Sequence, residues 1–413
     1  MLTRRQLLAG AAATGAGAAG IAIATSVREP ARRVGLVPLG DQPAGLPVRQ
    51  HAWSATLARD AAGDPVAPRF DRLLFFDVRG RPGPEHVRTL EAALRTLERA
   101  YPWGPSGLLL TAGWGPAYFE HVLGVASPIP QARALADFEL PSIDDYDLCL
   151  HLACDQESRL AAIEAALVHG ARVDDAHGWL DVSAAVQWRE TRTGFVGAGL
   201  PAAHQHVGGI PPGDPVKPSA PLFMGFKSGL IKNQATEDEV TIPSGQFAAG
   251  TTMHVSYMRL RLESWYQTLD ARERVARMYS PQTTPEQAAR FAVDAPGGLD
   301  QAISRYGVIG HAQTSARARR NGRPIIIRRD FNTVDGGQAG LHFVAVQRTI
   351  EDFIKTRTAM NAAFAQLQNP SISDTVNNGI NEFIFVLKRA NYILPSRSQR
   401  AFPLLRERER LLT

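Results

Sequence analysis

The chain of 413 residues is long enough for two or three ordinary domains or for one large duplicated domain. Hydrophobic residues make up 44% of it and charged residues 21%, which is the balance of a globular protein and excludes a largely disordered chain. The formal charge is only +5 and the basic residues are scattered, so the composition does not indicate a nucleic-acid-binding protein.

The N-terminus has the composition of an export signal. In MLTRRQLLAGAAATGAGAAGIAIATS, two arginines precede a weakly apolar stretch, and Ala22-Ile23-Ala24 fits a cleavage site. The T-R-R-x-L-L pattern is similar to a twin-arginine signal. A membrane anchor is the alternative, but an Ala/Gly-rich stretch is too weakly hydrophobic for a good transmembrane helix. We therefore expect residues 1–24 to be a signal peptide, read by the twin-arginine translocase, and the mature protein to be extracytoplasmic without stable membrane insertion.

The elements of the first half follow a Pro/Gly/Ala-rich segment, residues 25–68, which predicts an irregular lead-in. Hydrophobic periodicity predicts the strands RLLFFDV, GLLLTAGWG, DLCLHLA and AAVQWRE, and the helices PEHVRTLEAALRTLERAY and QESRLAAIEAALV. The third strand carries Cys149 and Cys154. Their spacing places them on opposite faces of a strand, so we expect no disulfide between them.

The second half repeats this style. TTMHVSYMRLRL, PIIIRR, GLHFVAVQ and EFIFVLKR predict strands, and ESWYQTLDARERVARMY and TIEDFIKTRTAMNAAFAQL predict helices. Strands and helices mixed at this spacing favour an α+β fold, with helices packed on antiparallel sheets. We expect two ferredoxin-like halves, residues 69–200 and 201–398, followed by a tail over residues 399–413.

The Pro/Gly-rich connection between the halves contains the motif HQHVGG. His204 and His206 can bind a metal at this spacing, but no third ligand is obvious nearby. Surface or loop histidines are the interpretation that we favour for this pair.

Four stretches of the second half resemble the dye-decolourising (Dyp-type) peroxidase family, which are haem proteins built from two ferredoxin-like halves. PLFMGFKSGLIKN is similar to the G-F-x-D-G-T-x-N motif of that family, and GHAQTSARARRNGRPIIIRRDFN is similar to the segment between its proximal His and its distal Arg. GTTMHVSYMRLRLESWYQTLDARER and GGQAGLHFVAVQRTIEDFIKTRTAMN are similar to its strand-then-helix segments. The match is strongest over residues 222–361 and weaker over residues 72–190.

The resemblance implies a site for haem b (iron protoporphyrin), with His311 as the ligand of the metal and Arg328 on the opposite haem face. A basic hairpin-like loop separates the two. Only one of Arg328 and Arg329 can face the pocket, because side chains alternate along a strand, and the resemblance selects Arg328. A guanidinium there stabilises negative charge on the leaving oxygen of a peroxide. The implied activity is reduction of hydrogen peroxide with oxidation of an unknown organic reductant.

The motif departs from the family at its acid. Gly225, Phe226, Lys227 and Gly229 match the frame of a cofactor-binding loop, but Ser228 stands where the proton-carrying Asp belongs. A neutral hydroxyl is a poor base, although it can position a water through hydrogen bonds. We therefore expect the haem site to persist and the proton transfer to be less efficient.

Further candidates for the pocket come from neighbouring positions. Family members often carry an Arg near Ser256 that meets a haem propionate; the basic residues here are Arg259 and Arg261, which strand alternation places on the face opposite Ser256. We assign Arg259 to the cofactor. Asp330 is expected to be an ordinary solvated acid, and the less favoured alternative is a carboxylate near the haem. Asn332 is expected to be a turn residue that can also line the pocket.

Two further groups of residues are expected to lie outside the pocket. The acidic run at residues 237–239 is typical of a solvated loop, and it replaces the lost acid only if that loop folds over the distal side. His254 is expected to be packed or hydrogen-bonded in its sheet.

Three functions stay open for this sequence. The first, which we favour, is a haem peroxidase with lowered proton-transfer capacity. The second is an extracytoplasmic haem-binding or iron-release protein with little peroxidase turnover, which Ser228 favours slightly. The third is a binding module on the same fold that carries no haem. A homo-oligomer is compatible with all three.

Overall fold

The computed structural model describes residues 37–228, 230–289 and 298–405. The predicted signal peptide and Gly229 lie outside the described residues, as do residues 25–36 of the predicted lead-in and the end of the predicted tail. Residues 37–68 form turns and isolated bridges, as expected for a lead-in. No helix of the described ranges is both long and apolar enough to cross a membrane.

The first half forms an antiparallel sheet with two helices, as the sequence predicts. Its main elements are β1 (Phe70–Val78), α1 (Pro84–Ala100), β2 (Leu109–Trp114), β4 (Leu148–Cys154), α2 (Glu157–His169) and β5 (Val186–Phe195). The strands lie in the order β5-β1-β4-β2. The first strand thus lies between the fourth and the third, the arrangement of a ferredoxin-like unit. Cys149 and Cys154 are buried in β4 and form no disulfide.

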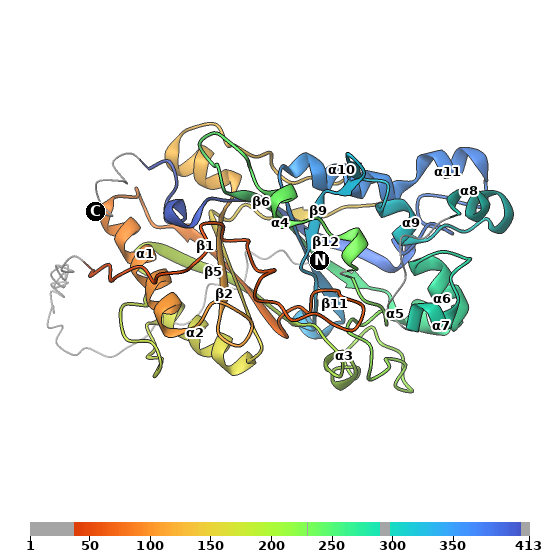
Figure 1. Cartoon of the computed structure of the whole chain (residues 1–413), viewed down its shortest axis with the longest axis horizontal. Coiled ribbons are helices and arrows are strands. Elements are labelled where there is room, and N and C mark those ends of the chain that lie inside the picture. The colour runs from red at the N-terminus through yellow and green to blue at the C-terminus, as the bar shows by residue number, and fades with distance from the viewer. Residues whose placement is uncertain (1–36, 229, 290–297, 406–413) are drawn as a thin grey trace, which may run out of the picture. The chain divides into compact units, whose positions relative to one another are not determined.

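Helix α1 shows why the hydrophobic pattern predicts this layer. Val87, Leu90, Leu94 and Leu97 are fully buried and recur every three or four residues, so they share the face that packs on the sheet. Pro84 begins the helix, where its missing N–H needs no partner. Figure 1 shows α1 and α2 beside the first-half strands, and both helices contribute to one apolar cluster with them.

The second half repeats this topology. Its strands are β6 (Thr251–Leu260), β9 (Ile326–Arg328), β11 (Gly340–Gln347) and β12 (Ile384–Leu394). They lie in the order β12-β6-β11-β9, and neighbours are antiparallel. The fourth strand again lies beside the first, and the third lies between the first and the second. The predicted α+β class with two ferredoxin-like halves is confirmed.

The helices of the second half are shorter than the hydrophobic pattern predicts. They are α5 (Leu262–Gln267), α6 (Ala271–Met278), α7 (Pro285–Ala289), α8 (Leu299–Gln301), α9 (His311–Ser315), α10 (Ile350–Asn361) and α11 (Ala363–Gln368). The helix predicted after β6 is interrupted because Asp270 caps α6 through the backbone N–H of Glu273. The helix predicted after β11 breaks at Ala362, whose φ of 51° is left-handed.

Short elements complete the chain. They are β3 (Ser142–Ile143), α3 (Leu200–Ala203), α4 (Glu237–Val240), β7 (Arg319–Arg320), β8 (Arg323–Pro324) and β10 (Phe331–Thr333). Strands β7 and β8 form the expected basic hairpin. Asn321 and Gly322 have φ of 50° and 76°, the positive values that a two-residue type I′ turn requires.

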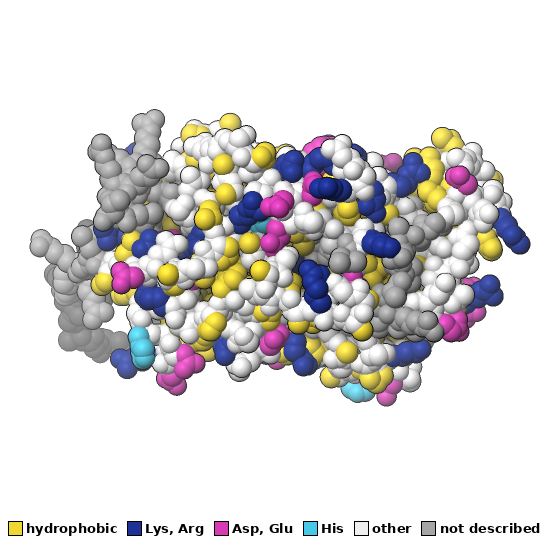
Figure 2. Space-filling view, in the orientation of Figure 1, with side chains coloured by type: hydrophobic (Ala, Val, Ile, Leu, Met, Phe, Trp, Pro, Cys, Tyr) yellow, Lys and Arg dark blue, Asp and Glu magenta, His cyan; other side chains and the backbone are white. Residues whose placement is uncertain are grey.

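The two sheets join into one ring of strands. Ile393 of β12 pairs with Trp114 of β2, and β10 pairs with both β5 and β11. Side chains from both halves fill the interior of this ring: Leu73, Phe75, Cys149, Met253, Val255, Phe331, Val344, Ala390, Tyr392 and Leu394. On the face in Figure 2, basic side chains are interspersed with acidic ones rather than gathered in one patch, as the composition indicates.

Candidate functional site

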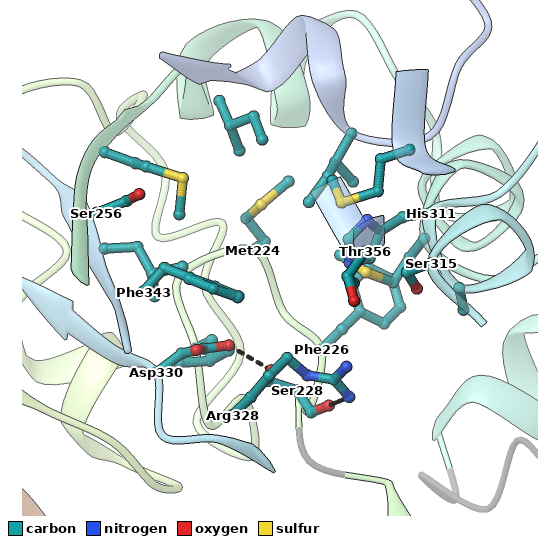
Figure 3. A pocket seen from close by; sticks show the side chains of 18 of the residues that line it. Met224, Phe226, Ser228, Ser256, His311, Ser315, Arg328, Asp330, Phe343 and Thr356 are labelled. Atoms are coloured by element: carbon teal, nitrogen blue, oxygen red, sulfur yellow. Dashed lines mark hydrogen bonds between the residues drawn. The ribbon is translucent and has the colours of Figure 1, made fainter. Parts of the chain in front are cut away.

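An apolar cavity lies in the second half, between the strands β6, β11 and β12 and the helices α9 and α10 (Figure 3). Four methionines and several aliphatic and aromatic side chains line it: Met224, Met258, Met278, Met360, Leu222, Phe226, Leu230, Leu260, Leu341, Phe343, Phe353, Ile380, Ile384 and Val386. The volume open to the centres of water molecules is about 130 Å³. That is roughly ten times the ~10–15 Å³ that holds one water, so the cavity has room for a larger ligand.

His311 is the first residue of α9 and faces this cavity. The preceding Gly310 is required, because a Cβ atom there would lie 1.8 Å from the carbonyl oxygen of Tyr279. Burial, with the guanidiniums of Arg328 and Arg357, lowers the pKa of His311 to about 3. The imidazole is therefore neutral, which is its metal-binding form. Its Nδ1 atom is buried and has no hydrogen-bond partner in the described part of the chain.

Arg328 ends β9 and also lines the cavity. The side-chain amide of Gln234 fixes its backbone, accepting the Arg328 N–H at 2.8 Å and donating to the Arg328 carbonyl at 3.1 Å. Its guanidinium donates to the backbone oxygen of Ser228 at 2.7 Å. Arg329 points to the other side of the strand, where it donates to the carbonyl of His51 at 2.6 Å. The structure thus places Arg328, and not Arg329, in the cavity.

Asp330 lies beside Ser228 and Arg328 at the same wall of the cavity (Figure 3). The Ser228 hydroxyl donates to Asp330 Oδ2 at 2.5 Å, whereas Oδ1 is buried without a partner among the described residues. Burial raises the pKa of Asp330 to about 6, against the opposing effects of Arg328 and Ser228. The expectation of an ordinary solvated acid is therefore wrong. Strand alternation carries the signal that was missed, since residues 328 and 330 share a face.

The G-F-K-S loop is held in place by buried hydrogen bonds. Asn332 lies in β10 and accepts the N–H of Phe223 at 2.8 Å, while its amide donates to the carbonyls of Phe195 and Pro221. It is therefore a buried strand residue that lines the cavity, and the prediction of a turn residue is wrong. The backbone carbonyl of Phe223 also accepts the hydroxyl of Tyr266 at 2.6 Å.

The other loop residues divide between the cavity and its support. Phe226 lines the cavity, and Lys227 reaches its edge, where its ammonium binds the carboxylates of Asp60 and Asp64. Gly225 is not among the lining residues; its φ of 87° shapes the turn. Gly229 lies outside the described residues.

The assignment of Arg259 to the cofactor is corrected. It is exposed and absent from the cavity wall, because Ser256, Met258 and Leu260 of β6 take the inward face and alternation turns Arg259 outward. Two other arginines line the cavity instead, Arg357 of α10 and Arg389 of β12, and Arg389 lies directly opposite Ser256.

These two arginines share one carboxylate. Arg389 Nη2 and Arg357 Nε donate to Glu139 Oε1 at 2.8 and 2.9 Å. Arg389 Nε has no hydrogen-bond partner in the described ranges. Two guanidiniums against one carboxylate leave excess positive charge at this wall. Sequence reasoning missed the pair because cross-strand register is not readable from a single strand.

The remaining candidates lie away from the cavity. His204 donates through Nδ1 to the carbonyl of Leu200 and stacks on Phe195. The described residues hold no cluster of three metal-ligating side chains. Glu237 binds the backbone N–H groups of the lead-in, and none of residues 237–239 lines the cavity. His254 is buried and hydrogen-bonded to Asn391, as expected.

A second cavity adjoins the first at the wall of Ser228, Arg328 and Asp330. The volume open to water centres is about 360 Å³. Its other lining residues include Trp53 and Pro68 of the lead-in and Val196 after β5. The three polar residues therefore contact two cavities at once.

Comparisons with known proteins agree with this topology. A model of a family of unknown function (DUF7405) matches residues 68–396. Among curated proteins, none matches the chain. Solved structures similar to it include DypB of Rhodococcus jostii, as a D153A variant in complex with heme (12% identity, TM-score 0.56, 86% of this chain and 99% of that one). A DyP-type peroxidase of Cellulomonas bogoriensis (18%, 0.53, 82% and 93%) and a dye-decolorizing peroxidase of Bacteroides thetaiotaomicron (13%, 0.53, 84% and 99%) are also similar.

Proposed function

The chain belongs to DUF7405, a family of unknown function, with the fold of the Dyp-type peroxidases, and we propose that it binds haem b and reduces hydrogen peroxide. One observation carries this proposal. A neutral imidazole and a guanidinium, from His311 and Arg328, line one apolar cavity together. A surface His and a solvated Arg have no reason to converge in this way.

The residues of the cavity fit a haem. Its apolar lining suits the two faces of a porphyrin, and four methionines adapt to an irregular outline. His311 would bind the iron, since its imidazole is neutral and faces the cavity. Arg357 and Arg389 would hold the haem carboxylates, because their charge is only half balanced by Glu139.

Peroxide reduction places a specific demand on Arg328. A bound haem would supply the electrons that break the O–O bond of the peroxide. Negative charge then develops on the leaving oxygen, and a fixed guanidinium in a water-poor site stabilises it. Arg328 is held for this role by Gln234 and by the carbonyl of Ser228. The organic reductant that restores the enzyme is not defined by these residues.

A second candidate function is supported by one observation. Metal-ligating histidines almost always donate their other ring N–H to a carboxylate, a carbonyl or a water. The Nδ1 atom of His311 has no such partner among the described residues. A weakly activated ligand favours haem binding or iron release with little peroxidase turnover.

Absorption spectroscopy tests the haem site directly. The full chain reconstituted with haem should show a Soret band, and His311→Ala should shift or abolish it, because the variant removes the nitrogen that binds iron. His204→Ala is a matched control that should leave the band unchanged, since His204 lies outside the cavity. A colourless reconstituted protein contradicts haem binding and supports a binding module without haem. A Soret band with negligible peroxide turnover selects the second candidate.

We also propose export through the twin-arginine route, supported by the T-R-R-x-L-L pattern and the Ala22-Ile23-Ala24 site. The N-terminal sequence of the mature protein tests this. A mature chain that begins at Thr25 supports it, and an intact Met1 in an extracytoplasmic fraction contradicts cleavage.

A further inference from the structure

We propose that Asp330, in the β9–β10 connection, carries the proton in peroxide reduction. In the resembling family this is the role of the acid at the position that Ser228 occupies here. This inference rests on the proposed haem site. It assigns a catalytic role to a residue two positions after Arg328, on the same face of the chain.

The geometry places a carboxylate beside the Ser228 hydroxyl, at the same wall of the cavity. The Ser228 hydroxyl donates to Asp330 Oδ2 at 2.5 Å, and the Ser228 carbonyl accepts from Arg328 at 2.7 Å. The three residues therefore form one connected group at the cavity wall, with Ser228 between the acid and the guanidinium (Figure 3). Oδ1 of Asp330 is the remaining acceptor, buried and without a partner in the described chain. A buried oxygen without a partner is costly unless a ligand or water supplies the hydrogen bond.

The charges around Asp330 keep it available for proton exchange. Arg328 is the charged group that faces it, and it opposes the raised pKa that burial causes. Lys227, on the neighbouring loop, is bound by Asp60 and Asp64 instead. Arg329 lies on the other side of the strand, where the charges of Glu237 and Asp71 act on it. A carboxyl whose pKa is about 6 populates both protonation states near neutral pH, which suits an acid–base catalyst.

The proton that Asp330 moves passes from one oxygen of the peroxide to the other. Ionised Asp330 accepts the proton of one peroxide oxygen and then donates it to the other. The O–O bond breaks with its electron pair on that second oxygen, which leaves as water while Arg328 stabilises its charge. Asp330 ends ionised, as it began. Overall, one peroxide takes up two electrons from the organic reductant and two protons, and yields two waters.

Asp330 also has a route to renew its protonation state. It lines the second cavity as well as the first, as do Ser228 and Arg328. Water in the second cavity can exchange protons with the carboxyl without crossing the apolar lining of the first. Neither cavity wall contains residues 237–239, so the acidic run is not an alternative carrier.

Cyanide association with the haem-loaded ferric protein tests this assignment apart from turnover. Hydrogen cyanide binds iron as an anion and must lose a proton, so a distal base accelerates association. Asp330→Asn keeps the shape and the hydrogen bond from Ser228 but cannot take a proton, and should slow association about 100-fold or more. The double variant Ser228→Asp/Asp330→Asn restores a carboxylate at this wall. It should associate with cyanide at least tenfold faster than Asp330→Asn alone. Asp238→Asn, at an exposed ion pair, is the matched control and should leave the rate unchanged.

Each outcome separates the two proposals. If the wild-type chain holds no haem, the proposed function fails and the Asp330 assignment fails with it. If wild type shows a Soret band and associates with cyanide no faster than Asp330→Asn, only the Asp330 assignment is overturned. If Asp330→Asn fails to fold, the pH dependence of the wild type decides. The assignment is supported if the rate of cyanide association depends on a group with pKa near 6, and if Ser228→Ala raises that pKa by removing a hydrogen bond to the carboxylate. It is overturned if the rate does not change with pH around 6.

Discussion

At the scale of single residues, two side chains of the candidate site lie beside positions where the family resemblance places other residue types. Ser228 stands where the family resemblance places an acid, and Asp330 brings a carboxylate to the same wall. Ser256 stands where the resemblance places a cation, and Arg389 lies directly opposite it on β12. In both cases a side chain from another segment of the chain lies next to the motif position, so the motif alone does not show every polar group of the cavity wall.

Burial of Asp330 has a consequence for stability that is separate from catalysis. Its pKa is raised to about 6 in the folded protein, against about 3.9 for an unperturbed Asp. Ionisation therefore opposes folding: the cost is absent below the unfolded pKa and complete above the folded one. Asp330→Asn should raise the free energy of unfolding by about 1–3 kcal/mol at pH 7–8 and by almost nothing near pH 4.

Chemical denaturation of the apo-protein at these two pH values measures the difference. Wild type and Asp330→Asn should converge as the pH falls. A variant that is less stable than wild type at pH 7–8 would show that Arg328 compensates the buried charge, and would contradict the raised pKa. A buried acid that lowers stability when it is ionised does not help the chain to fold, so its presence is better explained by function.

At the scale of elements, the sequence predicts most strands and helices because each buries one regular face. The second-half helices were predicted too long, since periodicity does not reveal the cap at Asp270 or the left-handed Ala362. Of the site, His311 and Arg328 reach the cavity as the resemblance implies. The roles of these two residues stay predictions.

The misassigned residues share one physical cause. Asp330 and Asn332 belong to the short connection through β10, whose pairing with β5 joins sequence positions more than a hundred residues apart. The prediction for Arg259 rests on one strand alone and does not include the strands beside it. Arg259 lies on the outward face of β6 and is therefore absent from the cavity wall. The local sequence shows which residues of a strand share a face. Only the pairing with distant strands determines whether that face lines the cavity.

At the scale of the whole molecule, the described strands and helices form two ferredoxin-like halves that share one core. The interior of the strand ring draws on β1 and β4 of the first half and on β6, β10, β11 and β12 of the second. Neither half encloses these side chains alone. A division into two halves in sequence is therefore not a division into independently stable parts.

The junction of β5 and β10 is the point at which this closure is most constrained. A Cβ atom on Gly194 would lie 2.1 Å from the carbonyl oxygen of Asn332 and 2.3 Å from the ring of Phe331. Asn332 also holds the loop that leads to the cavity through the N–H of Phe223. Closure of the ring and the shape of the cavity thus both depend on Asn332.

We expect the two halves to unfold in one cooperative transition because of this shared core. In urea, tryptophan fluorescence and far-ultraviolet circular dichroism should give the same midpoint, and Gly194→Ala should lower both midpoints together by the overlap at Asn332 and Phe331. Gly213→Ala, at an open position with positive φ, controls for backbone strain without overlap and should cost less. Two separated transitions, or a Gly194→Ala effect confined to one probe, would show that the halves are stable alone and that the ring is an association of two domains.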